Sequence, residues 1–509
     1  MKKNELRIGV VLSYINLALS TAIPLFYTPI MLRMLGQAEY GLYALAVSAV
    51  SYLSLLSFGM GSTIIRYISK YRAEKDKASE EKTFGFFFIL YCALACIVLI
   101  CGIIISNNAA AIFDKSLSAG ELSKIKTLLI IMTVSSAVSF PCAVFSSITI
   151  SHEKYIFRKL IDTLPTIVTP CANLLVLYLG HGSVGMALVA AILQVITLPI
   201  YIVYCFKKLQ VKPQFGLLPR KLVKEMFGFS AFVFLATIVD MLFWQTDKVI
   251  LGMLVGSTAV GVYNLGGTFN SIVMNLSTSI SGVLAPKITG MVVKESTNEE
   301  LSELFIRVGR LQYIVIALIL SGFTVFGRQF IYLWVGPEYE GTFWVAILTM
   351  FPLAIPLIQN TGLNIITAQN KHRFRSIVFL AIAILNVIST YLCVPYWGII
   401  GAAFCSCVSY LLGQGLIMNI YYYRVTKLDI PQFWRNILKM SPIPVAMTVL
   451  GVFLNQYISA SNWITFFLEV IVFSIIYMLL MHWFCFNSYE KSIYMNLLNK
   501  VIGKFDKRG

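Results

Sequence analysis

Long apolar runs alternate with short polar segments along almost the whole chain. A helix of about 20 apolar residues crosses the roughly 30 Å hydrocarbon core of a bilayer. Fourteen runs are long enough, and they span residues 8–34, 41–65, 83–105, 127–148, 160–179, 186–205, 226–254, 258–285, 311–333, 342–367, 377–395, 399–421, 440–457 and 462–484. The pattern therefore predicts an all-α polytopic membrane protein with about 14 transmembrane helices.

Two short motifs recur at nearly the same distance, which indicates an internal duplication. Residues 36–45 return 220 positions later as 256–265, with both glycines, a tyrosine and a leucine at identical spacing. Residues 182–187 return 216 positions later as 398–403. Chance recurrence in a glycine-rich membrane protein is the alternative, but the similar offsets favour duplicated halves, as in many transporters. The repeat predicts two pseudo-symmetric six-helix lobes and two C-terminal helices, with boundaries at 1–210, 211–423 and 424–509.

Composition excludes a soluble globular protein. Hydrophobic residues make up 58% of the chain and charged residues 12%, against about 25% charged in typical soluble domains. The mean hydropathy is +0.80. The net charge of +17 comes from short basic clusters between apolar runs. Such clusters set membrane topology, so no nucleic-acid partner is expected.

The basic residues predict the orientation of the chain. If the N-terminus is cytoplasmic, 34 of the 40 Lys and Arg residues fall in cytoplasmic loops and tails. The six on the other side are Arg33, Lys115, Lys124, Lys126, Lys248 and Arg328. Because cytoplasmic loops are enriched in Lys and Arg, both termini are predicted to be cytoplasmic.

No motif indicates an enzyme or a metal centre. The chain lacks a Gly-x-x-x-x-Gly-Lys-Ser/Thr phosphate loop, its loops are short, and its ten cysteines and four histidines have no metal-ligand spacing. We therefore expect no catalytic residues, no cofactor and no ATP-driven step. Any energy would come from an ion gradient or from the substrate itself.

Polar residues recur every three or four positions in three predicted helices. One stripe contains Asn16, a second contains Asn264, and a third contains Asn360; their members are Ser13, Asn16, Ser20, Pro24 and Tyr27, then Asn264, Thr268, Ser271, Asn275 and Ser279, then Pro356, Gln359, Asn360 and Asn364. Polar groups at membrane depth face the bundle or a water-filled cavity. Hydrogen bonding between helices would require the same residue types. Substrate contact and packing therefore both remain open for Asn16, Asn264 and Asn360.

Charged residues in or near the apolar runs are the other candidates. Asp240 lies about 20 Å into the seventh run, so it is a candidate proton or cation carrier, or a buried structural acid. Asp247 and Lys248 follow on the same predicted face. Arg33 and Arg66 end the first two runs and could bind phosphate groups through their planar guanidinium forks. Either arginine could instead anchor its helix at the headgroup layer.

Several motifs resemble Wzx-type polysaccharide flippases of the multidrug/oligosaccharidyl-lipid/polysaccharide (MOP) superfamily. They are residues 35–43, 66–72, 247–252 and 261–263. The resemblance implies movement of an undecaprenyl-diphosphate-linked oligosaccharide from the inner to the outer leaflet by alternating access through a cationic cavity. Of the candidate residues, only Arg33, Asp247 and Lys248 are carried over, because few basic residues of this chain lie deep in its helices.

The resemblance also implies a location and partners. The expected location is a bacterial cytoplasmic membrane, with membrane lipids and a polysaccharide polymerase or chain-length complex as further partners, and protons or sodium as coupling ions. The main alternative is a cation-coupled multidrug efflux antiporter, which Asp240 favours, whereas fourteen runs and the sequence Tyr40 to Tyr43 disfavour it. A polytopic glycosyltransferase or polymerase is a further alternative, but it would be expected to have a long catalytic loop.

Overall fold

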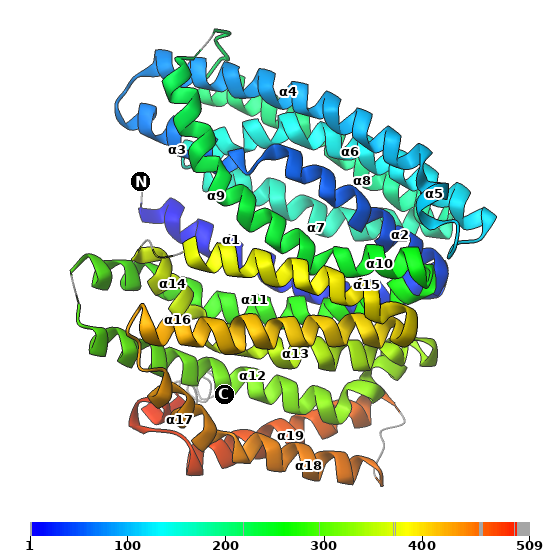
Figure 1. The fold of residues 1–509 in the computed structure, drawn as a ribbon, viewed down its shortest axis with the longest axis vertical. Coiled ribbons are helices and arrows are strands. Elements are labelled where there is room, and N and C mark those ends of the chain that lie inside the picture. The colour runs from blue at the N-terminus through cyan, green and yellow to red at the C-terminus, as the bar shows by residue number, and fades with distance from the viewer. Residues whose placement is uncertain are drawn as a thin grey trace, which may run out of the picture. The chain divides into compact units, whose positions relative to one another are not determined.

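The computed structural model describes residues 3–216, 218–294, 296–369, 371, 373–457, 462–492 and 494–495. Over these ranges the chain forms helices and no strand (Figure 1). Twelve helical stretches in the described part are long and apolar enough to cross a membrane. The prediction of an all-α polytopic membrane protein is therefore confirmed.

All fourteen predicted runs are helical, although two of them share one stretch. Runs 377–395 and 399–421 fall in Phe374–Arg424, where Gly398 (φ 53°, ψ −132°) interrupts α15 (Arg373–Tyr410). That backbone conformation favours glycine because glycine has no Cβ. Run 258–285, which contains the stripe from Asn264 to Ser279, forms α11 (Ser257–Val293), a helix that is not among the twelve stretches.

Three predicted runs contain breaks that periodicity alone did not indicate. Run 41–65 becomes α2 (Gln37–Ser51), a 3-10 turn (Tyr52–Ser57) and α3 (Met60–Ala73), with left-handed residues between the turn and α3. Run 226–254 divides at Gln245 into α9 (Arg220–Trp244) and α10 (Thr246–Leu254). Run 342–367 divides at Gln359 into α13 (Gly341–Ile358) and α14 (Asn360–Ala368).

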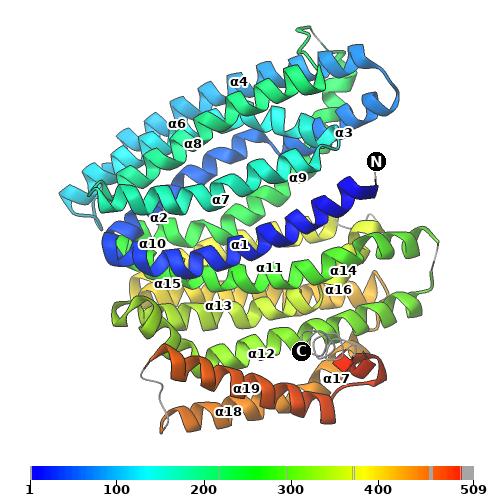
Figure 2. The same cartoon turned by 180° about the vertical axis from the view of Figure 1, so that it is seen from behind.

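The first compact unit comprises residues 1–265 and 376–405. Its further helices are α1 (Lys3–Leu35), α4 (Lys77–Asn107), α5 (Ala109–Phe113), α6 (Ala119–Ser151), α7 (Tyr155–Tyr178) and α8 (Gly182–Val203). Helix α6 packs between α4 and α8 (Figures 1 and 2). Aromatic side chains fill the α4–α6 contact, where the Phe84 and Phe145 ring centroids lie 5.5 Å apart. This packing holds the predicted N-terminal half together.

The second unit comprises residues 266–375 and 406–509. It contains α13, α14, α12 (Asn298–Val335), α16 (Met418–Arg424), α17 (Ile430–Met440), α18 (Pro442–Asn455) and α19 (Trp463–Phe484). Both α18 and α19 pack against α12 (Figure 1). The fully buried Tyr477 hydroxyl donates to the Ile314 carbonyl oxygen at 3.0 Å and ties α19 to α12. The two C-terminal helices are thus an integral part of this unit.

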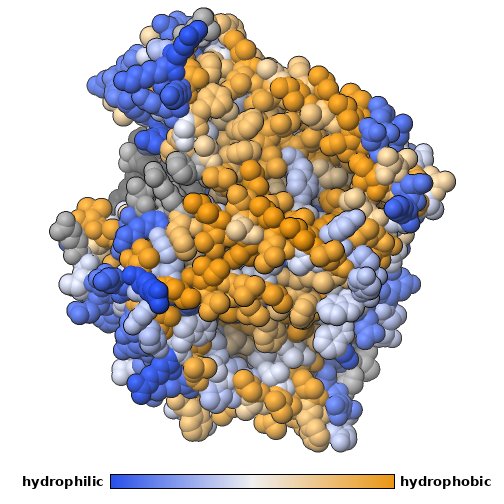
Figure 3. All heavy atoms as spheres, viewed as in Figure 1, coloured by the Kyte–Doolittle hydropathy of each residue, from blue (hydrophilic) through white to orange (hydrophobic). Residues whose placement is uncertain are grey.

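The surface has the distribution expected for a membrane protein. Hydrophobic side chains cover the middle of the helices in each unit, and hydrophilic side chains gather toward the helix ends (Figure 3). Exposed apolar residues on α4 include Ile89, Ile97 and Ile100. A bilayer would cover such residues.

The division into lobes at residues 210 and 423 stays a prediction.

Candidate functional site

The repeated turn begins with a glycine in a conformation that other residues rarely adopt. Gly36 has φ 77° and precedes α2, and its counterpart Gly256 has φ 121° and precedes α11. Positive φ values are accessible to glycine at little steric cost. The first glycine of each copy therefore lets the chain leave one helix and start the next within one or two residues.

The second glycine of each copy allows the two copies to touch. A Cβ on Gly41 would lie 1.7 Å from the Ser257 carbonyl oxygen, and a Cβ on Gly261 would lie 2.9 Å from the Gln37 carbonyl oxygen. Gln37 and Ser257 are themselves 220 positions apart, so the contact is reciprocal. A contact in which each copy uses the same surface is typical of two-fold symmetry. Within the first unit, α2 and the start of α11 therefore meet as structural equivalents.

Side-chain hydrogen bonds surround this contact. Asn264 Nδ2 donates to the Tyr40 hydroxyl at 2.7 Å. The Ser257 hydroxyl donates to Glu121 Oε1 at 2.5 Å, and the Ser116 hydroxyl donates to the Gly252 carbonyl oxygen at 2.5 Å. The start of α6 and the segment before it thus hold the α10–α11 turn in place.

A buried acid lies next to the repeated turns. Asp247 is 1% exposed in the first turn of α10, where the positive end of the helix dipole favours a carboxylate. The Tyr263 hydroxyl donates to Asp247 Oδ2 at 2.5 Å, and the Thr390 hydroxyl donates to Oδ1 at 3.3 Å. Two hydroxyl donors from separate helices therefore stabilise the carboxylate.

The first half has a related pair without an acid. Asn173 Nδ2 donates to the Tyr27 hydroxyl at 3.0 Å. Tyr27 lies 220 positions before Asp247, and Asn173 lies 217 positions before Thr390, so the pairs occupy nearly equivalent places. Of these two pairs, only the one in the second copy contains a carboxyl group. The duplication has therefore diverged at this position.

The break at Gln245 separates Asp240 from Asp247, whereas Lys248 lies next to Asp247 on α10. Asp240 lies on α9 with an exposed side chain. Lys248 is half-buried and donates to Gln245 Oε1 at 3.2 Å. At Gln245 the backbone is distorted (φ −116°), and α9 ends immediately before this residue while α10 begins immediately after it. The acid predicted to be deepest is thus more exposed than Asp247.

The two arginine candidates differ in their surroundings. Arg33 is exposed in the last turn of α1 and forms no ion pair with any residue that the structure describes. Arg66 is also exposed, but its guanidinium carbon lies 4.6 Å from the centroid of the Phe229 ring. Such a cation–π contact is typical of a side chain engaged in packing. Arg33 therefore has the guanidinium that is more available to a ligand.

The polar stripes are only partly brought into this site. Asn264 lies in the cluster, whereas Asn16 is half-buried on α1 and Asn360 is half-buried at the start of α14 in the second unit. The Ser13 side chain lies outside the described residues. The cluster instead includes Tyr40 and Tyr263 from the repeated motif. It also includes Thr390, for which the sequence offered no signal.

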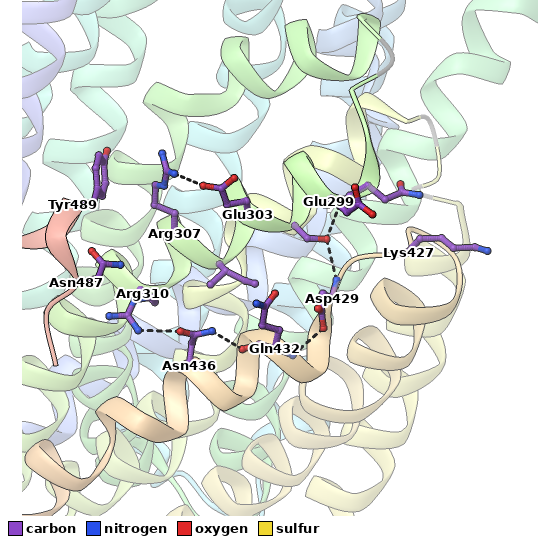
Figure 4. A pocket seen from close by; sticks show the side chains of 13 residues that line it. Glu299, Glu303, Arg307, Arg310, Lys427, Asp429, Gln432, Asn436, Asn487 and Tyr489 are labelled. Carbon is purple, nitrogen blue, oxygen red and sulfur yellow. Dashed lines mark hydrogen bonds and ion pairs between the residues drawn. The ribbon is translucent and has the colours of Figure 1, made fainter.

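The second unit contains a separate polar pocket of about 600 Å³ beside α12 and α17 (Figure 4). Arg310 is buried at its edge and donates to both carboxylate oxygens of Glu490, at 2.6 and 2.7 Å. Arg310 also donates to Asn436 Oδ1 at 3.2 Å. These bonds fix the segment after α19 to α12.

Among the described residues, no group of three or more His, Cys, Asp or Glu is placed to hold a metal ion.

Comparison with solved structures identifies the fold. The lipid II flippase MurJ in an inward closed conformation aligns with a TM-score of 0.73 and 16% identity, covering 93% of this chain and 98% of that chain. A multidrug resistance MATE family transporter of the MOP superfamily, in an inward-facing conformation, aligns with a TM-score of 0.61 and 14% identity. The alignment covers 77% of this chain and 92% of that chain. The fold is therefore that of MOP-superfamily transporters.

Sequence comparison then identifies the family. EpsK, an uncharacterized membrane protein of Bacillus subtilis, is 21% identical over 80% of this chain and 81% of its own length. A candidate O-antigen transporter of Shigella flexneri is 20% identical over 76% of this chain and 91% of its own length. Residues 9–292 match the family described as polysaccharide biosynthesis protein, and the chain belongs to this family. The predicted resemblance to polysaccharide flippases of the MOP superfamily is confirmed.

Proposed function

We propose that this protein is a flippase that moves an undecaprenyl-diphosphate-linked oligosaccharide from the inner to the outer leaflet of a bacterial cytoplasmic membrane. Its membership in the polysaccharide biosynthesis family and its fold support this proposal. A large polar sugar head cannot cross hydrocarbon unaided, whereas the prenyl tail can remain in lipid. The protein therefore needs to supply a polar path for the head and no bond-making chemistry. Both termini lie in the cytoplasm in this proposal.

The reciprocal contact between Gly41 and Gly261 is the observation that carries the proposed mechanism. Alternating access requires equivalent ends of two halves to meet in one state and to separate in the other. This contact is formed largely by backbone atoms of equivalent turns. Separation of the turns would break the bond from Asn264 to Tyr40, together with the bonds that tie the α10–α11 turn to Glu121 and Ser116.

Substrate contacts are assigned by charge and position. Arg33, exposed and without an ion pair in the described part of the chain, is the principal diphosphate ligand in this proposal. Lys248 and Arg66 supply further positive charge along the path. Asn16, Asn264 and Asn360 offer hydrogen bonds to sugar hydroxyl groups. A polysaccharide polymerase or chain-length complex would receive the product on the outer side.

Asp247 is the proposed coupling residue. A proton or a sodium ion could neutralise its buried carboxylate, and the Tyr263 and Thr390 hydroxyl groups would adjust to either state. Because Tyr263 belongs to the repeated turn, the state of Asp247 would affect the contact between the turns. Asp240 is the second acid proposed to take part, as a partner for a cation in the path.

A translocation assay tests the proposal. Purified protein is reconstituted in proteoliposomes with a fluorescent undecaprenyl-diphosphate-linked oligosaccharide, and chemical quenching reports the leaflet that holds the label. The flippase proposal predicts transfer well above that of protein-free liposomes. Transfer equal to protein-free liposomes, with correctly folded protein, would reject it.

The second candidate function is a cation-coupled multidrug efflux antiporter. The buried acid Asp247 and the likeness in fold to the MATE family transporter favour it. The same proteoliposomes distinguish the two functions. An antiporter would move a fluorescent cationic drug against its gradient when a proton or sodium gradient is imposed, and it would leave the lipid-linked oligosaccharide in place.

A further inference from the structure

The second unit has an apolar groove on the side of α18 and α19, about 350 Å³ in volume. Its walls include Leu450 and Leu454 of α18 and Val472 and Ile476 of α19, all of which have exposed side chains. Val325 of α12 and Phe473 of α19 approach Gly451, so the three helices are closely packed there. The groove therefore lies over a closely packed part of the unit and has exposed side chains in its walls.

Two hydrogen-bond acceptors in this groove lack donors. Oε2 of Glu469 and Oδ1 of Asn455 are enclosed by protein, and neither accepts a hydrogen bond from any residue in the described ranges. The Asn455 amide nitrogen is already used, since it donates to the Val325 carbonyl oxygen at 3.0 Å. An acceptor that lacks a donor at membrane depth is costly, and more so when it is a carboxylate. Rotation about the last bond of Glu469 exchanges its two oxygens, so the carboxylate that lines the groove can present one oxygen to a donor there while the other stays enclosed.

The depth of Glu469 limits what can supply the donor. It is the seventh residue of α19, so it lies about 9 Å along the helix from Trp463. Tryptophan is enriched at the membrane surface, where lipid headgroups lie. A headgroup at that surface would be too far away to reach the carboxyl group. A side chain on a transmembrane helix can place a donor at any depth.

We propose that this groove is the docking site for a transmembrane helix of a partner protein that presents a donor side chain, such as Lys, Arg, Ser or Thr, near Glu469. The apolar walls would receive the neighbouring side chains of that helix. A second copy of this chain using the same groove would bring acceptor against acceptor, so a different protein fits better. This proposal concerns a partner and does not depend on which substrate the protein moves.

Site-specific photo-crosslinking in membranes of the native host tests this proposal. A photoreactive amino acid is placed at Leu450 or Val472 in the groove, with matched controls at Val449 and Ile471. The control residues are exposed on the same two helices. Each is next in sequence to its groove position, so its side chain points about 100° away from it around the helix. The groove positions should give an adduct with one membrane protein, and the control positions should not.

Mapping the adduct supplies the decisive readout. The cross-linked peptide should lie in a transmembrane segment of the partner, within one helical turn of a donor side chain. Glu469→Leu should lower the adduct yield roughly three- to fifteenfold, the range expected for an interhelical hydrogen bond, while Glu469→Gln, which keeps an acceptor, should lower it less. Membrane levels of each variant, measured by immunoblot, show that the protein is folded.

Other outcomes would overturn the proposal. These are adducts with lipid or with a second copy of this chain, equal yields at groove and control positions, no adduct, or a yield unchanged in Glu469→Leu. Residues 458–461 lie outside the described ranges and carry the hydroxyl groups of Ser459 and Ser461. Replacing both serines with alanine should leave the yield unchanged. A loss as large as that of Glu469→Leu would instead assign the donor role to this connection.

Discussion

Gly41 and Gly261, equivalent residues of the two repeated turns, each pack against the backbone of the other copy within the first unit. The carbonyl oxygens that they approach belong to Ser257 and Gln37, which are also equivalent. The sequence repeat is thus also a contact in space. Its dependence on glycine makes it sensitive to a single added methyl group.

Gly41→Ala should impair translocation. The new Cβ would lie 1.7 Å from the Ser257 carbonyl oxygen, so the two turns must move apart. Overpacking of this kind typically costs about 1–3 kcal/mol, and we expect translocation in proteoliposomes to fall roughly tenfold. Gly267→Ala on α11 is the matched control, since nothing described lies within 4 Å of its added Cβ. Equal activity in the two variants would show that the contact has no role in transport.

Asp247→Asn should remove the dependence of translocation on an ion gradient. Asparagine keeps one acceptor oxygen, and its amide nitrogen can donate to the other hydroxyl group, but it cannot titrate or carry the charge. Translocation is measured with and without an imposed proton or sodium gradient, in parallel with Asp240→Asn. If the gradient accelerates Asp247→Asn as much as the unmodified protein, the coupling site lies elsewhere. A normal rate in Asp240→Asn would remove that residue from the mechanism.

Arg33→Ala should slow translocation roughly tenfold or more. Loss of a charge-assisted hydrogen bond costs about 1.5–3 kcal/mol. Arg33→Lys should recover only part of the rate, because an ammonium group lacks the planar fork that binds phosphate in a bidentate manner. The measurement is the initial rate with the fluorescent lipid-linked oligosaccharide. If both variants match the unmodified protein, Arg33 is a membrane-surface anchor.

Glu490→Ala should destabilise the second unit. It would leave the buried Arg310 guanidinium without its carboxylate, which typically costs about 3–5 kcal/mol. Thermal unfolding in detergent should show a clear decrease in Tm. Arg307→Ala is the control, because its pair with Glu303 is exposed and such pairs contribute less than about 1 kcal/mol. Similar Tm values for both variants would contradict this role of the buried pair.

The predicted topology can be tested with cysteine labelling in a cysteine-free background. Ala73 and Lys115 are both exposed, and the distribution of basic residues predicts that they lie on opposite sides of the membrane. A membrane-impermeant maleimide added to intact cells should modify Lys115→Cys and leave Ala73→Cys unmodified until the membrane is permeabilised. The reverse pattern would invert the orientation.

The helices could be predicted well because each depends on local sequence. A run such as 83–105 is apolar over the length needed to cross a bilayer, whatever lies around it. Breaks were harder to predict. The break at Gln245 does not interrupt the apolar run, and residues 240–250 around it include neither glycine nor proline to indicate a boundary. Gly398, in contrast, belongs to a repeated motif and coincides with a predicted boundary.

The sequence by itself determined the class of protein, the positions of the membrane-spanning runs, and the repeat that includes Gly41 and Gly261. These are properties of composition and spacing along the chain. Only the tertiary structure decided that Gly41 meets the second copy of its own motif, and that Thr390 contacts Asp247 across 143 positions. It also decided that Asp247 is buried while Asp240 is exposed. Contacts between distant helices depend on how their surfaces pack, and no local pattern of apolar and polar residues specifies that packing.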